Sequence, residues 1–178
     1  MLTAKMCLAD DHDDETTVIA TENAQAKNLF QCGFEDWEKA WTAEENFFIL
    51  EATENFKKAR ESFSKAVQLN PKTFEYQKYF NLSCLKIEGN ESFNEAVKLQ
   101  NQANETSLKY LFQESRNKFE EACKKYQQGY SASGNSKFIE CKAFIEQSIS
   151  TINMAIKKLQ LNTGLADINF SDKDRGFD

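Results

Sequence analysis

The sequence contains little proline, glycine or histidine. Among its 178 residues there are one proline, six glycines and one histidine. Proline removes a backbone hydrogen-bond donor, and glycine destabilises a helix interior by about 1 kcal/mol, so a chain poor in both is biased toward helices. The length is typical of one domain, which buries enough surface to need no disulfide or metal to hold its core. We therefore predict an all-α fold.

The sequence also lacks the side chains from which active sites are commonly built. Its only histidine, His12, lies in the acidic run of residues 10–15, which has no periodic apolar face. A mobile string of carboxylates binds divalent metals weakly, and no helix has the Glu-x-x-His spacing of a di-iron site. We expect a non-catalytic protein with no metal site and no cofactor.

Long apolar runs and closely spaced cysteines are absent. No run approaches the roughly 18 apolar residues of a membrane span, and residues 1–15 lack the basic and apolar regions of a secretory signal. An odd number of widely separated cysteines is typical of reduced thiols rather than of disulfides or zinc sites. We expect no membrane span and a cytoplasmic, reducing location. The five cysteines are Cys7, Cys32, Cys84, Cys123 and Cys141.

Charge divides the chain into an acidic first third and a basic body. Residues 1–54 carry 3 basic and 13 acidic side chains, residues 55–160 carry 17 and 11, and the whole chain has a net charge of −6. The basic residues are mostly lysines spread around helical faces, and together with the acidic total they argue against nucleic-acid binding. We expect the body to meet either an acidic partner or the acidic first third of the chain.

Helical periodicity places the folded domain at residues 18–162. Residues 1–17 are predicted to form an acidic flexible tail, and residues 163–178 a loose C-terminal tail. The last helix has the clearest pattern, because its apolar residues follow one another at spacings of three or four. These residues are Phe138, Cys141, Ile145, Ile149, Ile152, Ile156 and Leu159.

Helix ends are expected where glycine interrupts the pattern. Gly33 is predicted to end the first helix, and a later helix of about residues 73–87 is predicted to close at Gly89. Residues 37–69 form either one helix or two, and a break near residues 42–45 is the alternative to a continuous helix.

An aromatic residue followed three positions later by a small residue recurs along the chain. A ring at the start of a helix needs a small neighbour one turn on, where a partner helix approaches closely. The recurrence indicates stacked antiparallel helical hairpins. The five pairs are Trp37/Ala40, Phe56/Ala59, Phe93/Ala96, Phe119/Ala122 and Phe138/Cys141.

One segment carries a more specific pattern, made by Phe56, Ala59, Phe63, Ala66, Leu69 and Pro71. These residues stand at the offsets of the second helix of a tetratricopeptide repeat, so residues 40–73 resemble one such repeat. A weaker second repeat would begin at Phe74. The first repeat departs from the family at Ala43, where a bulky aromatic residue is usual, and at Phe47, where a small one is. The expected fold is a stack of antiparallel helical hairpins, either a divergent tetratricopeptide-like array or a helical bundle.

The resemblance implies a partner-binding surface formed by the first helix of each repeat. Its apolar and acidic character favours an apolar or basic partner segment. The clamp with which such repeats hold chaperone C-termini is absent, because Glu44 and Phe48 stand at two of its positions. The alternative that Trp41 and Phe48 are core residues stays open. The predicted partner-binding residues are Trp41, Glu44, Phe48, Glu51, Lys78, Leu82 and Leu85.

Taken together, these patterns predict a non-catalytic adaptor or assembly subunit that binds an apolar or basic segment of another protein. One alternative is a dedicated chaperone or secretion escort, which would release its client where a subunit would stay bound. A second alternative is a helical bundle that encloses a small apolar ligand.

Overall fold

The computed structural model describes residues 12–173, with side chains over residues 17–162. This part of the chain contains no strand, and the predicted all-α class is confirmed. The elements in chain order are α1 (His12–Glu45), α2 (Ile49–Leu69), α3 (Phe74–Thr106), α4 (Lys109–Ser133), the short 3-10 helix η1 (Ser136–Ile139) and α5 (Lys142–Lys173).

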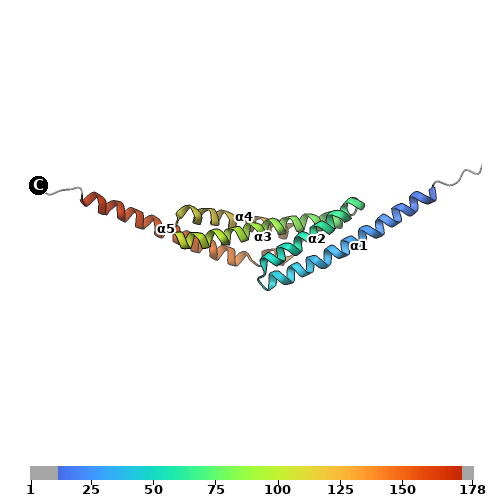
Figure 1. The fold of residues 1–178 in the computed structure, drawn as a ribbon, viewed down its shortest axis with the longest axis horizontal. Coiled ribbons are helices and arrows are strands. Elements are labelled where there is room, and N and C mark those ends of the chain that lie inside the picture. The colour runs from blue at the N-terminus through green and yellow to red at the C-terminus, as the bar shows by residue number, and fades with distance from the viewer. Residues whose placement is uncertain (1–11, 174–178) are drawn as a thin grey trace, which may run out of the picture.

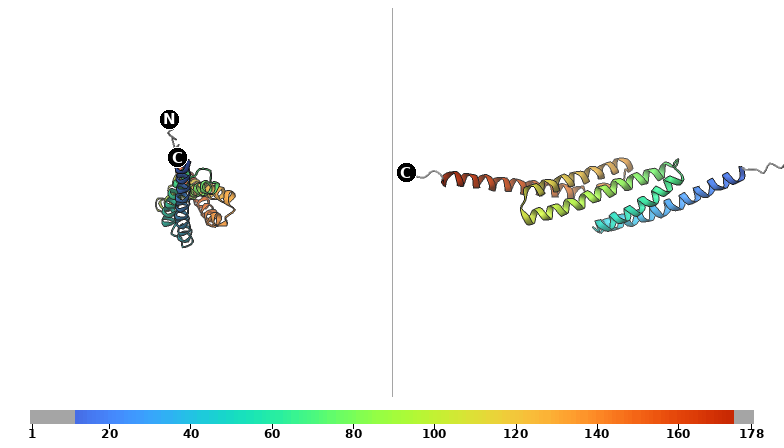
Figure 2. Two further views of the ribbon diagram at one scale, coloured as in Figure 1. Left: turned by 90° about the vertical axis from the view of Figure 1, so that its right-hand side faces the viewer. Right: turned by 45° about the horizontal axis from the view of Figure 1, so that its top comes forward.

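The helices form an elongated stack of antiparallel hairpins (Figure 1). Helices α1 and α2 make the first hairpin, α3 and α4 make the second, and contacts between α2 and α3 join the two. Helix α5 packs on α4 and then continues past it (Figure 2). The start of α1 and the end of α5 lie at opposite ends of the long axis (Figure 2). The expected stacking of helical hairpins is therefore confirmed.

Helix α2 forms as its sequence predicts. Phe56, Ala59, Phe63 and Ala66 follow at spacings of three or four, and all four are fully buried. The helix ends at Leu69 because a residue that precedes proline is kept out of helical angles. This is the stretch that carries the strongest resemblance to a repeat, and its predicted buried face is confirmed.

A turn at residues 46–48 separates α1 from α2, so residues 37–69 form two helices. The break lies just after the expected 42–45. Phe47 adopts a φ of 63°, in the left-handed region that glycine usually occupies at the end of a helix. The Phe47 N–H donates to the Glu44 carbonyl at 2.8 Å, and the Phe48 N–H donates to the Ala43 carbonyl at 2.9 Å. A bulky residue in this conformation is strained, by roughly 1–2 kcal/mol.

The helix ends predicted at Gly33 and Gly89 are wrong. Helix α1 continues past Gly33, and α3 continues past Gly89 to Thr106. Both glycines are sites of close helix approach instead. A Cβ at Gly33 would lie 2.7 Å from the Phe63 ring, and one at Gly89 would collide with the Tyr126 ring.

The expected second repeat does not form a pair of helices. Its residues make the single helix α3, which pairs with α4. Helix α1 begins at His12 and α5 continues to Lys173, so the helical backbone extends beyond the expected bounds of 18 and 162. The remaining residues of the two expected tails, 1–11 and 174–178, lie outside the described residues.

Three apolar clusters form the core, and α3 contributes to each of them. The smallest joins Ala26, Ala66 and Tyr76. The first core cluster lies among α1, α2 and the N-terminal half of α3, to which η1 adds Phe138. The second core cluster lies among the C-terminal half of α3, α4 and α5. Helix α3 gives Leu82 and Ile87 to the first, and Ala96 and Ala103 to the second.

Candidate functional site

The residues predicted to bind a partner do not form one open groove. Trp41 and Leu82 belong to the first core cluster, so the core alternative holds for Trp41. Phe48 is 61% exposed, so that alternative does not hold for it. The structure buries Trp41, Glu44 and Leu82, leaves Lys78 and Leu85 half-buried, and exposes Phe48 and Glu51.

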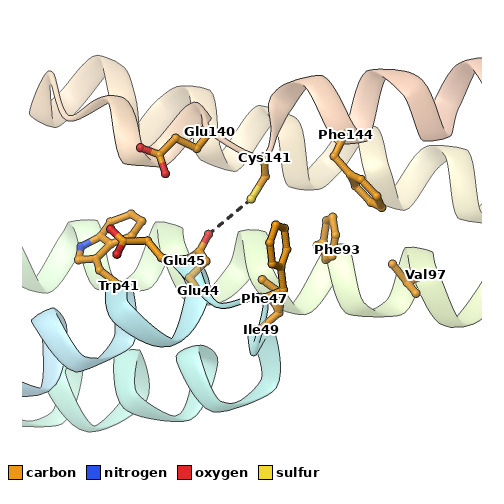
Figure 3. Close-up of a pocket in the computed structure, with 10 residues that line it drawn as sticks. All are labelled: Trp41, Glu44, Glu45, Phe47, Ile49, Phe93, Val97, Glu140, Cys141 and Phe144. Carbon is orange, nitrogen blue, oxygen red and sulfur yellow. Dashed lines mark hydrogen bonds between the residues drawn. The ribbon is translucent and has the colours of Figure 1, made fainter.

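A pocket of about 480 Å³ lies where the end of α1, the α1–α2 turn, α3 and the start of α5 meet (Figure 3). We call it the hairpin pocket. It has an acidic end and an apolar end, with Trp41 and Cys141 in the wall near the acidic end. Glu44, Glu45 and Glu140 form the acidic end; Phe47, Ile49, Phe93, Val97 and Phe144 form the apolar end.

Exposed aromatic side chains surround the apolar end. Phe47 is 88% exposed, although its backbone adopts an unfavourable conformation to place it there. Phe144 is 54% exposed, and its ring lies 5.8 Å from that of Phe93. Phe48 and Leu50 extend this apolar surface along the start of α2 through an adjoining hollow. Large exposed apolar groups gathered around a pocket are typical of a binding surface.

A buried ion pair lies behind the acidic end. The Lys86 side chain is fully buried, and its Nζ lies 2.5 Å from Glu44 Oε1. The same Nζ lies 4.5 Å from the ring centroid of Trp41 and 4.4 Å from that of Tyr126. Burial lowers the pKa of Lys86, and Glu44 opposes this shift by stabilising the charged amine. The pair joins the acidic first third of the chain to its body.

Glu44 has one carboxylate oxygen without a partner. Its Oε1 receives Lys86 and, at 3.6 Å, the Cys141 thiol. Its Oε2 is buried and accepts no hydrogen bond from any described residue. Removing a charged acceptor from water without pairing it is costly, by about 1–3 kcal/mol or more. Because Glu44 lines the hairpin pocket, a group bound there would lie close to this unsatisfied acceptor.

Cys141 provides a chemical test of the geometry of this pocket. Burial, together with the charge of Glu44, raises the pKa of the Cys141 thiol to about 11, where an ordinary thiol titrates near 9. At neutral pH its thiolate population is then about 100-fold below that of an ordinary thiol. We expect iodoacetamide to alkylate Cys141 far more slowly than the exposed Cys32, as measured by peptide mass spectrometry. Equal rates would contradict the described packing of Glu44 against Cys141.

The described residues contain no group of three or more His, Cys, Asp or Glu side chains arranged to hold a metal ion. The acidic run of residues 10–15 lies outside the described side chains. No helix in the described part of the chain combines the length and apolar character needed to cross a membrane. The four cysteines with described side chains are free thiols.

Sequence reasoning found only Trp41 and Glu44 of this pocket. The aromatic–small pairs predict that Phe93 and Cys141 lie where helices approach closely. One local signal for the pocket does exist, the run of four apolar residues 47–50 just after the expected break at 42–45. Four consecutive apolar residues cannot all face the core where a helix begins, so some of them must be exposed.

Comparison of the chain with protein-family models, with curated proteins and with solved structures finds no match. The candidate site therefore rests on the geometry described above.

Proposed function

We propose that this protein is a non-catalytic adaptor or assembly subunit that binds an apolar segment of a partner protein in the hairpin pocket. The observation that carries the proposal is the exposed apolar surface around the pocket, with Phe47 at its rim. A strained backbone that presents an aromatic side chain to solvent is characteristic of functional positions. Interface anchors are typically aromatic residues of this kind.

The size of the pocket favours a segment over a whole domain as the bound element. About 480 Å³ accommodates a few side chains. An amphipathic helix or an extended segment that inserts its apolar side chains into a groove fits this volume. The resemblance of α2 to a tetratricopeptide helix supports protein binding as the function class, although the proposed site lies at the hairpin ends and not on a concave face. The free thiols support a reducing, cytoplasmic location.

The pocket volume also favours a second candidate, the binding of a small apolar ligand. Ligand sites typically measure about 300–1,000 Å³, and this pocket falls in that range. Native mass spectrometry of the protein purified from its source separates the two candidates. A small ligand would add the mass of one small organic molecule to the intact chain, whereas a bound protein partner would add the mass of a whole polypeptide.

The test of the adaptor proposal is a double substitution at the pocket, Phe47→Ala with Phe144→Ala. Truncating an aromatic anchor costs roughly 2 kcal/mol or more of binding free energy, which is about 30-fold in affinity. We expect affinity purification with quantitative mass spectrometry to show the loss of specific partners from this variant. The matched control is Phe74→Ala with Tyr110→Ala, which removes two rings that are 79% and 55% exposed on other parts of the surface. This control variant should retain the specific partners.

Both variants should melt close to the parent protein, because the substituted rings are exposed. Retention of every partner by a folded pocket variant would show that the hairpin pocket is not the binding site.

A further inference from the structure

The acidic end of the hairpin pocket has more carboxylates than its lysines neutralise. Three carboxylates line the pocket, and no lysine or arginine does. Glu44 is paired with Lys86, and Glu45 with Lys137 at 2.6 Å. Among the described residues, no lysine or arginine forms an ion pair with Glu140. One negative charge therefore remains at this end of the pocket.

The surroundings of Glu44 strengthen the attraction of this negative charge for a cation. Glu44 is only 8% exposed, and its Oε2 is an acceptor that no described residue satisfies. A charge pair in such a partly dry site is screened less by water than a pair on the open surface. The ring of Trp41 adds an electron-rich surface to the same wall and already lies beside two ammonium groups, those of Lys86 and Lys137, at 4.5 and 5.8 Å from its centroid.

We propose that the partner segment carries a lysine or arginine beside its apolar anchor, and that the carboxylates of Glu44 and Glu140 attract this cation. The apolar anchor lies against Phe93 and Phe144 at the other end of the pocket (Figure 3). This inference rests on the proposed function, because it specifies the chemistry of the segment bound there. The apolar end supplies binding free energy, and the acidic end sets which segments are accepted.

The experiment selects peptides on the full-length protein from a phage library of random dodecapeptides. We expect the selected peptides to combine a large apolar residue with a lysine or arginine. A synthetic consensus peptide with its basic residue replaced by norleucine should bind at least about tenfold more weakly. Its affinity should become insensitive to salt, because the screened interaction has been removed.

Three protein variants assign the cation to its site. The double variant Glu44→Gln with Lys86→Met removes the buried carboxylate without leaving the buried amine unpaired. The variant Glu140→Gln removes the exposed carboxylate. Each should bind the consensus peptide more weakly and discriminate less between it and its norleucine analogue. The control Glu105→Gln neutralises an exposed carboxylate elsewhere on α3 and should change neither affinity. Circular-dichroism melts establish that all three remain folded.

The outcomes separate this inference from the function on which it rests. Apolar peptides without basic residues, whose binding still requires Phe47 and Phe144, would overturn the cation site and leave the adaptor proposal standing. Peptides that bind equally well to the Phe47→Ala/Phe144→Ala variant would show that the hairpin pocket is not the binding site. That result would overturn both proposals. A basic preference that persists in the Glu44 and Glu140 variants would also overturn the assignment.

Discussion

Replacing Glu44 with alanine is expected to lower the free energy of unfolding by about 3–5 kcal/mol, the cost of breaking a buried ion pair by removing one partner. Lys86 would then keep its amine fully buried among aromatic rings without a counter-ion. Lys86 has no exposed surface in the intact protein, so its amine depends on Glu44 for a charge partner. The measurement is urea denaturation followed by circular dichroism.

The same variant should show a characteristic dependence on pH. Burial lowers the pKa of Lys86 below the 10.5 of a free lysine, so between the two values the unfolded chain binds more protons than the folded one. Stability therefore rises with pH in that window. Without Glu44 the pKa of Lys86 falls further, because the charged amine has lost its stabilising partner. The difference in the free energy of unfolding between the parent and the variant should therefore shrink as the pH rises toward 10.5 and the amine becomes neutral.

Two controls identify the buried pair as the cause. Glu45→Ala removes the exposed partner of Lys137 and should cost about 1 kcal/mol or less. Glu44→Leu with Lys86→Met replaces the pair by apolar side chains and should recover most of the lost stability. Similar losses for Glu44→Ala and Glu45→Ala would contradict the burial of Lys86.

Phe63→Ala is expected to destabilise the protein by about 3–5 kcal/mol, because it opens a cavity in the first core cluster. Phe63 is fully buried, and its ring lies 5.3 Å from that of Phe30 and 5.6 Å from that of Tyr79. It thereby bridges α1, α2 and α3. The Cβ position of Gly33 lies against this ring, so the neighbouring backbone already packs closely there.

The control for this prediction is Phe74→Ala, which removes the same ring from a position that is 79% exposed. Its effect on the denaturation midpoint should be small. Equal midpoint shifts for the two variants would show that the register of α2 in the stack differs from the one described.

The parts of the fold that follow from local pattern were predictable. The buried face of α2 and its end before Pro71 depend on residues that are neighbours in the sequence. The continuity of α3 through Gly89 and Asn90 was not predictable in this way. It depends on Tyr126, which is 36 residues from Asn90 and donates a hydrogen bond to its side chain at 2.7 Å. A glycine at a helix crossing and a glycine at a helix end look alike in a single sequence.

The candidate site was even less accessible to sequence reasoning. Its three stretches of chain lie near residues 44, 93 and 141, and only the packing of the two hairpins brings them together. The hydrogen bond between Cys141 and Glu44 spans 97 residues. Periodicity assigns a residue to a face of its helix, but it does not say which other helix that face will meet. The charge asymmetry did indicate that the first third and the body would attract each other, and two ion pairs of the pocket are contacts of that kind.

The sharing of α3 by the two larger core clusters has a consequence for how the helices separate on unfolding. This helix is about 50 Å long, and neither hairpin detaches without stripping apolar contacts from one half of it. Partial opening should therefore be rare in its central turns, whose amide hydrogens exchange with solvent only when the whole assembly of helices is lost. The amides near the start of α1, far from either cluster, exchange through local fraying. We therefore expect amide exchange to be slowest in the centre of α3 and fastest near the start of α1.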